Sequence, residues 1–151
     1  MMIGKDFILA GKAIFTLTVS HEFAVKHDCK DHYTFRVVRK AASEKWPEAY
    51  FVNVLMGPDN TRSYAPLGKL DPQTGLVSIT KNSKFNDSSW PVKMVRRIFA
   101  CVWELDGSKP ENITVAGFEL NHAGRCGRCG RLLTTPTSIK IGLGSICVNL
   151  I

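Results

Sequence analysis

A cluster of cysteines near the C-terminal end constrains this chain more than any other feature. Cys126 and Cys129 are separated by two residues, and Cys147 follows in a later segment. Two cysteines at this spacing can direct both thiolates at one tetrahedral ion, and Zn²⁺ then takes its remaining ligands from a distant segment. Gly130, directly after the second cysteine, predicts the tight turn that such a site needs. The pattern therefore predicts a zinc site with these three cysteines as ligands.

A closed structural zinc site needs a fourth ligand. His122 is the best candidate, because it comes shortly before Cys126 at the end of a predicted strand. Cys29 and His32, from a polar segment at 27–32 that we predict to be a hairpin tip, are the alternatives. With four protein ligands no position remains for a water molecule, so the metal is predicted to stabilise the segment and not to catalyse a reaction.

Other interpretations of the cysteines are less consistent with the sequence. The total of five is odd, and the C-terminal clustering is untypical of a disulfide framework. Free buried cysteines would sit poorly among Gly and Arg residues, and a redox Cys-x-x-Cys would follow a βαβ pattern that is absent here. His27, Cys29 and His32 offer the residue types of a second metal site, but no spacing among them closes a site alone, so a polar turn is favoured.

The first 80 residues alternate between apolar and polar side chains. Period-two patterns rich in β-branched and aromatic residues predict half-buried strands. Turn signals at 57–60 and 71–75 separate them, and short turns between consecutive strands favour an antiparallel meander. The predicted strands include residues 15–19, 33–37, 50–54 and 76–80.

A helical pattern follows the strands. Trp90-Pro91 suits a helix entry, and Asp106-Gly107 suits its end. Residues 113–120 return to a strand pattern, with a bulge expected at Gly117, and lead directly to His122. We therefore predict an α+β fold, in which residues 1–121 form an antiparallel sheet packed on one main helix and residues 122–151 form a zinc-binding module packed on it. The apolar stripe of the helix consists of Val95, Ile98, Phe99, Val102 and Leu105.

The net charge of the chain indicates what kind of partner it could bind. The chain has 151 residues, 44% hydrophobic and 22% charged, which is ordinary for a globular protein. It carries 20 Lys and Arg against 13 Asp and Glu, a net charge of +7, which suits nucleic acid or an acidic protein surface. No apolar run reaches the roughly 18 residues of a membrane span, and Lys12 interrupts the N-terminal one. A cytoplasmic protein of a bacterial host cell is expected.

Basic residues are concentrated in two places. No Asp or Glu occurs from His122 to Ile151, so the arginines there are unopposed in the sequence. Arginine binds phosphates and carboxylates through bidentate contacts, although some of these residues would simply be solvated or would shield the thiolates. The candidates for partner binding are Arg125, Arg128, Arg131 and Lys140 in the C-terminal segment, and Lys93, Arg96 and Arg97 on the predicted helix.

The C-terminal segment has a specific pattern of cysteines, glycines and arginines. The residues that form it are His122, Gly124-Arg125-Cys126, Cys129-Gly130-Arg131, Leu133-Thr134, Pro136, Ser138-Ile139, Gly142, Gly144 and Cys147. The pattern resembles that of an uncharacterised family of small bacterial, plasmid and phage proteins. Ser145 stands where the family has proline, and the upstream fragments 9–13, 33–37 and 57–60 are similar to family members less sharply. The resemblance implies a zinc-binding protein of a phage or mobile element and implies no activity.

The sequence contains no motif of catalysis that we recognise. There is no Gly-rich phosphate loop, no Gly-x-Ser-x-Gly elbow, and His21-Glu22 lacks the second histidine of a zinc protease helix. We therefore predict a non-enzymatic protein that binds nucleic acid or a nucleoprotein through its basic surface, with no membrane and no small-molecule substrate. The alternative is a phage-encoded inhibitor of a host protein, such as an anti-CRISPR or other anti-defence protein or a transcription inhibitor.

Overall fold

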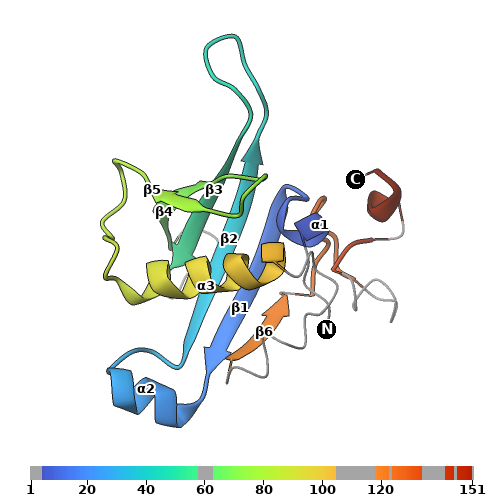
Figure 1. Ribbon diagram of the computed structural model, residues 1–151. Coiled ribbons are helices and arrows are strands. Elements are labelled where there is room, and N and C mark those ends of the chain that lie inside the picture. The colour runs from blue at the N-terminus through green and yellow to red at the C-terminus, as the bar shows by residue number, and fades with distance from the viewer. Residues whose placement is uncertain are drawn as a thin grey trace.

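The computed structural model describes residues 5–57, 63–104, 118–122, 124–133, 142–144 and 146–150. Six strands form one antiparallel sheet in the order β5-β4-β3-β2-β1-β6, and helix α3 lies across one of its faces (Figure 1). The helices are α1 (Lys5–Ile8), α2 (His21–His27), α3 (Trp90–Glu104) and the short 3-10 turn η1 (Cys147–Leu150). The strands are β1 (Lys12–Val19), β2 (His32–Lys40), β3 (Ala49–Leu55), β4 (Tyr64–Leu70), β5 (Val77–Ile79) and β6 (Phe118–His122).

The core lies between the sheet and α3. Along β1 and β2 every second side chain is buried, because successive residues of a strand point to opposite faces. Phe99 on α3 is fully buried, and its ring centroid lies 6.1 Å from that of Phe15 on β1. The predicted α+β architecture is confirmed. Buried core residues include Leu17, Phe35, Val37, Val52 and Val54 from the sheet, and Val95, Ile98 and Val102 from the helix.

The strand order follows the sequence order from β5 back to β1, as the predicted meander requires. β6 then pairs with the free edge of β1, with His122 opposite Phe15. This pairing places the end of β6 beside the start of β1. The predicted strand 113–120 is described only from residue 118, and Gly117 and the predicted helix end at 106–107 lie outside the described residues.

The predicted hairpin tip at 27–32 is wrong in part, because a helix lies between β1 and β2. Ser20 begins α2 by accepting a hydrogen bond from the backbone N–H of Phe23 over 3.2 Å. Asp28 ends it in a left-handed conformation with φ 50°. The helix is only seven residues long and lacks an apolar stripe, so its sequence carries no helical period. Only the residues after Asp28 form the expected polar turn.

Strand β4 also has no counterpart in the sequence prediction. Pro66 and Gly68 interrupt its alternation, and both residue types are depleted in strands. The register of β4 against β3 shifts between Val52 and Asn53, which marks a bulge or irregularity there. Leu67 and Leu70 are three positions apart, so in a regular strand they would point to opposite faces. The shift in register allows both to be buried. Pairing with β3 therefore defines this strand, and its own pattern does not.

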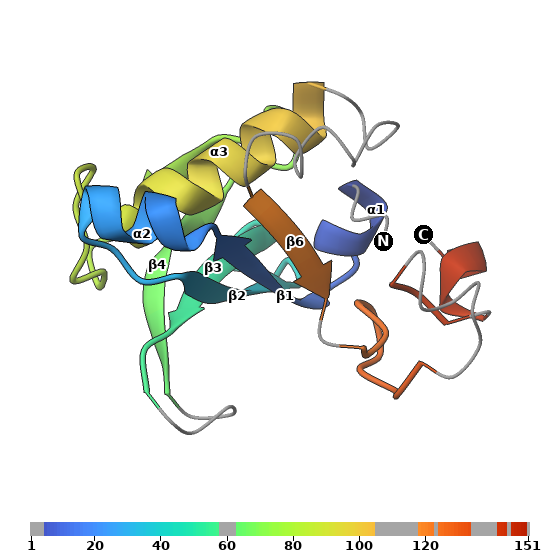
Figure 2. The ribbon, with the colours of Figure 1, turned by 90° about the horizontal axis from the view of Figure 1, so that it is seen from below.

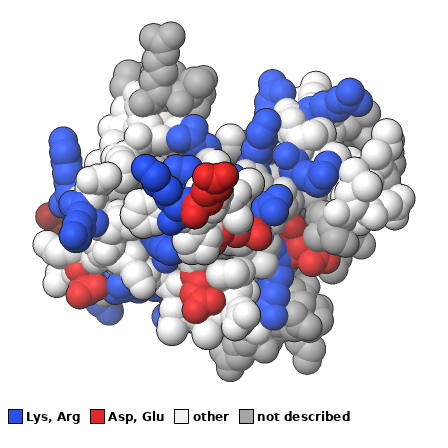
Figure 3. Space-filling view, turned by 90° about the horizontal axis from the view of Figure 1, so that it is seen from above, with Lys and Arg blue, Asp and Glu red and all other residues white. Residues whose placement is uncertain are grey.

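The C-terminal segment lies beside α1 and the start of β1, away from α2 (Figures 1 and 2). Seen from above, Lys and Arg side chains are spread over the face of the molecule, and one group of them lies on the side of this segment (Figure 3). Among the described residues, no helix has the length and apolar character to cross a membrane.

Candidate metal centre

A small hairpin carries the first two cysteines. The backbone N–H of Cys126 donates to the carbonyl of Arg131 over 2.8 Å, and that of Gly130 donates back to the carbonyl of Cys126 over 2.9 Å. Gly130 has φ +81°, a left-handed conformation that L side chains rarely adopt. The turn that carries the chain past Cys129 thus depends on a glycine at this position, as the sequence predicted.

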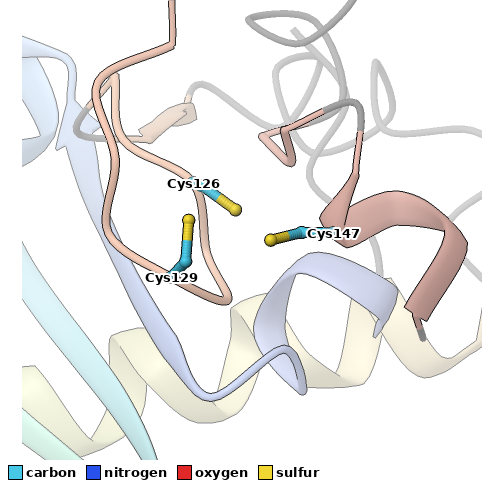
Figure 4. Close-up of side chains that lie close together, drawn as sticks. All are labelled: Cys126, Cys129 and Cys147. Carbon is cyan, nitrogen blue, oxygen red and sulfur yellow. The ribbon is translucent and has the colours of Figure 1, made fainter.

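The third cysteine approaches from the other side. Cys147 is the first residue of η1, and its sulfur points toward those of Cys126 and Cys129 (Figure 4). The three Sγ atoms all lie within 4.8 Å of one another, and none forms a disulfide. Cys126 and Cys147 are buried, whereas Cys129 is exposed. The three cysteines predicted as ligands therefore come together and could hold one metal ion.

Backbone N–H groups point at the sulfur of Cys126. Gly144 donates to this Sγ over 3.3 Å and Arg128 over 3.4 Å. Burial favours the neutral thiol, but the hydrogen bonds from Gly144, Cys129 and Arg128 outweigh burial and lower the pKa of Cys126 to about 7. This environment stabilises a thiolate, which is the form of cysteine that binds metals.

Cys147 has a different environment. Burial and its hydrogen bonds with Cys129 and Cys126 raise the pKa of Cys147, while Arg128 opposes the shift. The guanidinium Nη1 of Arg128 lies 4.0 Å from the sulfur of Cys147. A cation at this distance offsets part of the negative charge that three clustered thiolates would carry.

His122 is close to the hairpin but is not in the cysteine group. It is buried at the end of β6, and its Nδ1 accepts a hydrogen bond from the backbone N–H of Gly124 over 2.8 Å. In a neutral ring whose Nδ1 accepts, Nε2 carries the proton, so neither nitrogen presents a lone pair to a metal in this arrangement. Ligation by His122 would require a rotated or retautomerised ring, and it stays a prediction.

The two alternative fourth ligands are distant. Cys29 and His32 belong to the connection from α2 to β2, and His32 pairs with Thr18 near the end of β1. Lys12, at the start of β1, donates its backbone N–H to Gly127 in the cysteine hairpin. At about 3.4 Å per residue, β1 separates the two sites by about 20 Å. The sheet geometry therefore places Cys29 and His32 too far away to share a metal with Cys126.

Phe7 of α1 packs against both halves of the cysteine segment. The Phe7 ring is buried, and its centroid lies 5.7 Å from that of His122. A Cβ on Gly142 would lie 2.4 Å from Cδ1 of Phe7, and one on Gly127 would lie 2.9 Å from the same atom. The absence of side chains at both glycines lets the two halves of the cysteine segment close around this ring.

The three C-terminal arginines are all exposed. Nη1 of Arg125 donates to the carbonyl of Gly130 over 3.2 Å, and Arg128 reaches the sulfur of Cys147. None of Arg125, Arg128 and Arg131 forms an ion pair with a carboxylate among the residues that the structure describes. Their positive charge therefore faces solvent on the cysteine hairpin, hereafter the arginine loop (residues 125–131). Lys140 lies outside the described residues.

The second basic group lies elsewhere and is partly used within the fold. Arg96 donates to the carbonyl of Val77 from Nε over 3.2 Å and from Nη2 over 3.0 Å, and its Nη1 lies 2.7 Å from Oδ1 of Asp87. Lys93 lies over the ring of Trp90 at 4.6 Å, and Arg97 is exposed. These residues belong to the first turns of α3, which lie away from the C-terminal segment (Figures 1 and 2). The two predicted basic groups do not form one continuous surface.

The C-terminal residues match a known family. Residues 121–150 match a family of unknown function (DUF6011). No curated protein and no solved structure matches the chain. The match spans the arginine loop, the three cysteines and His122, and it is consistent with the resemblance to an uncharacterised family.

Proposed function

We propose that this chain is a non-enzymatic zinc-binding protein that contacts nucleic acid or a nucleoprotein through its arginine loop. The observation that carries the proposal is the placement of three exposed arginines, none paired with a carboxylate of the described residues, on the hairpin that also supplies two converging cysteines. A metal ion would fix the shape of this hairpin, and the arginines would then be presented in a defined arrangement.

The donor set supports zinc as the metal. Zn²⁺ binds thiolates at about 2.3 Å in tetrahedral geometry, which places two bound sulfurs about 3.8 Å apart. The sulfurs here lie within 4.8 Å of one another, which is compatible with three of the four positions of such a site. The backbone N–H groups of Gly144 and Arg128 donate hydrogen bonds to the sulfur of Cys126. Such hydrogen bonds orient and stabilise a metal-bound thiolate.

The charge of the loop supports an anionic partner. Three thiolates and a neutral fourth ligand around Zn²⁺ carry a formal charge of about −1, so the arginines leave the loop positive. Guanidinium groups bind phosphates bidentately, and such contacts bind the nucleic acid backbone independently of its sequence. The resemblance to phage and plasmid proteins adds a phage or mobile element as the proposed origin.

The first test is an electrophoretic mobility shift with metal-loaded protein, using duplex and single-stranded DNA and RNA at two salt concentrations. We expect binding that weakens steeply with salt, because each neutralised phosphate releases a counterion. The triple variant Arg125→Ala, Arg128→Ala, Arg131→Ala should lose most of its duplex binding while keeping its metal.

The matched control removes the same charge elsewhere. Lys26, Lys45 and Lys81 are exposed and lie outside the loop, so their triple replacement by alanine should weaken binding much less. If both variants lose the same amount of nucleic-acid affinity, the loss follows from net charge alone, and a defined binding site is contradicted. If metal-loaded protein binds no nucleic acid at low salt, the proposal fails, and an inhibitor of a host protein becomes the better hypothesis.

A further inference from the structure

The sheet has a second face, opposite α3, that no described helix covers (Figure 2). Its side chains are those at the alternate positions of β1 to β4 that do not enter the core. They are half-buried by their neighbours and open to solvent, in contrast to the buried set on the helix side. This outward face comprises Lys12, Ile14, Thr16 and Thr18 of β1; His32, Thr34, Arg36 and Val38 of β2; Phe51, Asn53 and Leu55 of β3; and Tyr64, Pro66 and Lys69 of β4.

The outward face is basic. Lys12, Arg36 and Lys69 contribute positive charge, and none of the outward positions of β1 to β4 holds an acidic residue. Arg36 forms no ion pair with a carboxylate among the described residues, and its buried Nε has no hydrogen-bond partner there. The charge of this arginine is therefore not neutralised by the described part of the protein.

Two aromatic rings occupy the same face. The guanidinium carbon of Arg36 lies 4.2 Å from the ring centroid of Tyr64, which holds the arginine against the sheet. Phe51 pairs across the ladder with Val38 on one side and with Lys69 on the other. Phe51 on β3 and Tyr64 on the adjacent strand β4 thus each have a cationic side chain as a neighbour.

Polar groups complete the face. The hydroxyls of Thr16 and Thr34 are hydrogen-bonded over 2.8 Å, and Asn53 pairs with Arg36 across the ladder. Hydroxyl and amide groups can donate to and accept from the edges of bases. A surface that combines aromatic rings, cations and short polar side chains differs from an apolar docking face, which would be rich in exposed aliphatic residues.

We propose that the outward face of the sheet binds single-stranded nucleic acid, with bases stacked on Phe51 and Tyr64 and phosphates bound by Arg36, Lys12 and Lys69. Unpaired bases can stack on aromatic side chains, whereas the bases of a duplex are already stacked inside it. The positive charge of Lys12, Arg36 and Lys69 complements a phosphate backbone. Acidic residues occur at the end of the face farthest from Lys12, where Glu119 of β6 pairs with Thr18 and Asp31 contacts His32. This site goes beyond the arginine loop, from which it differs in its residues and in its preference for single strands.

The test measures the affinity of metal-loaded protein for a fluorescein-labelled oligodeoxythymidylate and for a duplex of the same length by fluorescence anisotropy. The single strand should bind more tightly. Phe51→Leu keeps an apolar side chain but removes the aromatic face, and it should weaken single-strand binding about tenfold. Phe51→Tyr and Tyr64→Phe keep the rings and should bind as the native protein does.

Arg36→Met keeps the aliphatic stem over Tyr64 but removes the charge. It should weaken single-strand binding and reduce its salt dependence by about one phosphate contact. Leu76→Ala is the control for a loss of apolar surface, because Leu76 is 69% exposed and lies beside Trp103, away from the outward face. It should change nothing. Far-UV circular dichroism and metal content report whether each variant keeps its fold.

The outcomes separate the two sites. If Phe51→Leu and Arg36→Met bind single strands as the native protein does, the inference about the sheet is wrong, whatever the arginine-loop variant shows. If the sheet variants lose single-strand binding and the arginine-loop variant loses neither single-strand nor duplex binding, the sheet site stands and the loop proposal fails. The native protein and all variants could also fail to bind single strands, while the native protein captures a host protein that the sheet variants do not. The face would then serve a protein partner, and the inference would be overturned.

Discussion

The sheet with its covering helix and the C-terminal cysteine segment differ in the amount of apolar surface that they bury. The first has a continuous core in which Phe15, Phe35 and Phe99 are fully buried. Among its described residues the second has a separate cluster of four buried side chains, Cys126, Leu133, Leu143 and Cys147, with Ala10 packed against it. Burial stabilises by about 25 cal/mol per Å² of apolar surface, so a cluster of this size does little against the entropy of ordering its chain. The comparison indicates that packing holds the sheet, and we expect the cysteine segment to depend on the metal ion that its three cysteines could hold.

Of the changes that test this difference between the two regions, loss of the metal should have the largest effect. Cys126→Ser should abolish stoichiometric metal binding and expose the cysteine segment to protease, because structural zinc contributes on the order of 10–16 kcal/mol in small peptides. The sheet should keep its circular dichroism spectrum. Metal content by atomic emission and limited proteolysis measure the two effects. Cys29→Ser is the matched control and should retain the metal; retention of metal by Cys126→Ser would contradict the ligand assignment.

The converse experiment targets the sheet core. Phe99→Ala should cost about 3–5 kcal/mol of unfolding free energy, because it removes a fully buried ring that packs on Phe15. Urea denaturation measures the loss. Phe99→Leu, which leaves a smaller cavity, should cost less than the alanine variant. A core change that released the metal from the folded protein would show that the two regions are stabilised as one unit, against the comparison above.

His122 lies between the two regions and tests how the metal site joins the sheet. His122→Ala should lower metal affinity at least 10–100-fold, whether the ring is a ligand or positions the hairpin through Gly124. Competition with a chelating dye measures the affinity. His21, exposed at the start of α2, provides the control and should leave it unchanged. Unchanged affinity in His122→Ala would remove His122 from both roles.

A smaller effect is expected where Phe7 meets the cysteine segment. Gly142→Ala places a Cβ 2.4 Å from Cδ1 of Phe7 at a φ of +76°, so either the backbone or the ring must move. We expect a loss of about 1–3 kcal/mol, seen as a lower thermal midpoint and faster proteolysis of the segment. Gly144→Ala, whose nearest contact would be at 3.9 Å, should be much milder. Equal effects of the two substitutions would argue against Phe7 as the joint.

The smallest effect concerns surface charge in the sheet region. The hydrogen bond from Nε of Arg39 to Glu48, 2.5 Å long, holds the pKa of the Glu48 carboxyl below its usual range. A carboxyl with a lowered pKa in the folded state stabilises the protein above its unfolded pKa, and this stability is lost as the pH falls through the folded pKa. Both side chains are exposed, so the loss should be slight. Glu48→Gln should remove this part of the pH dependence of the thermal midpoint; a large change would contradict packing as the main source of stability in this region.

The sequence predicted those elements that a local residue pattern is enough to define. The period-two strands β1, β2 and β3 and the apolar stripe of α3 follow from alternation and helical spacing, because each buries one face against the core. The cysteine hairpin follows from local spacing and from Gly130. Helix α2 was missed, because a short helix without an apolar stripe has no period. Strand β4 was missed, because Pro66 and Gly68 break its alternation and only its pairing with β3 defines it.

The sequence by itself determined the chemistry of the ligands. It identified three cysteines as one set, placed the arginines beside them and gave the fold class, because ligand spacing and side-chain periodicity are local properties. The tertiary structure decided the distances that join remote segments. It brought Cys147 to the hairpin, placed Cys29 and His32 at the other end of β1, and closed the cysteine segment around Phe7. It also placed Arg36, Phe51 and Tyr64 on one open face, because sheet register sets which residues of separate strands become neighbours.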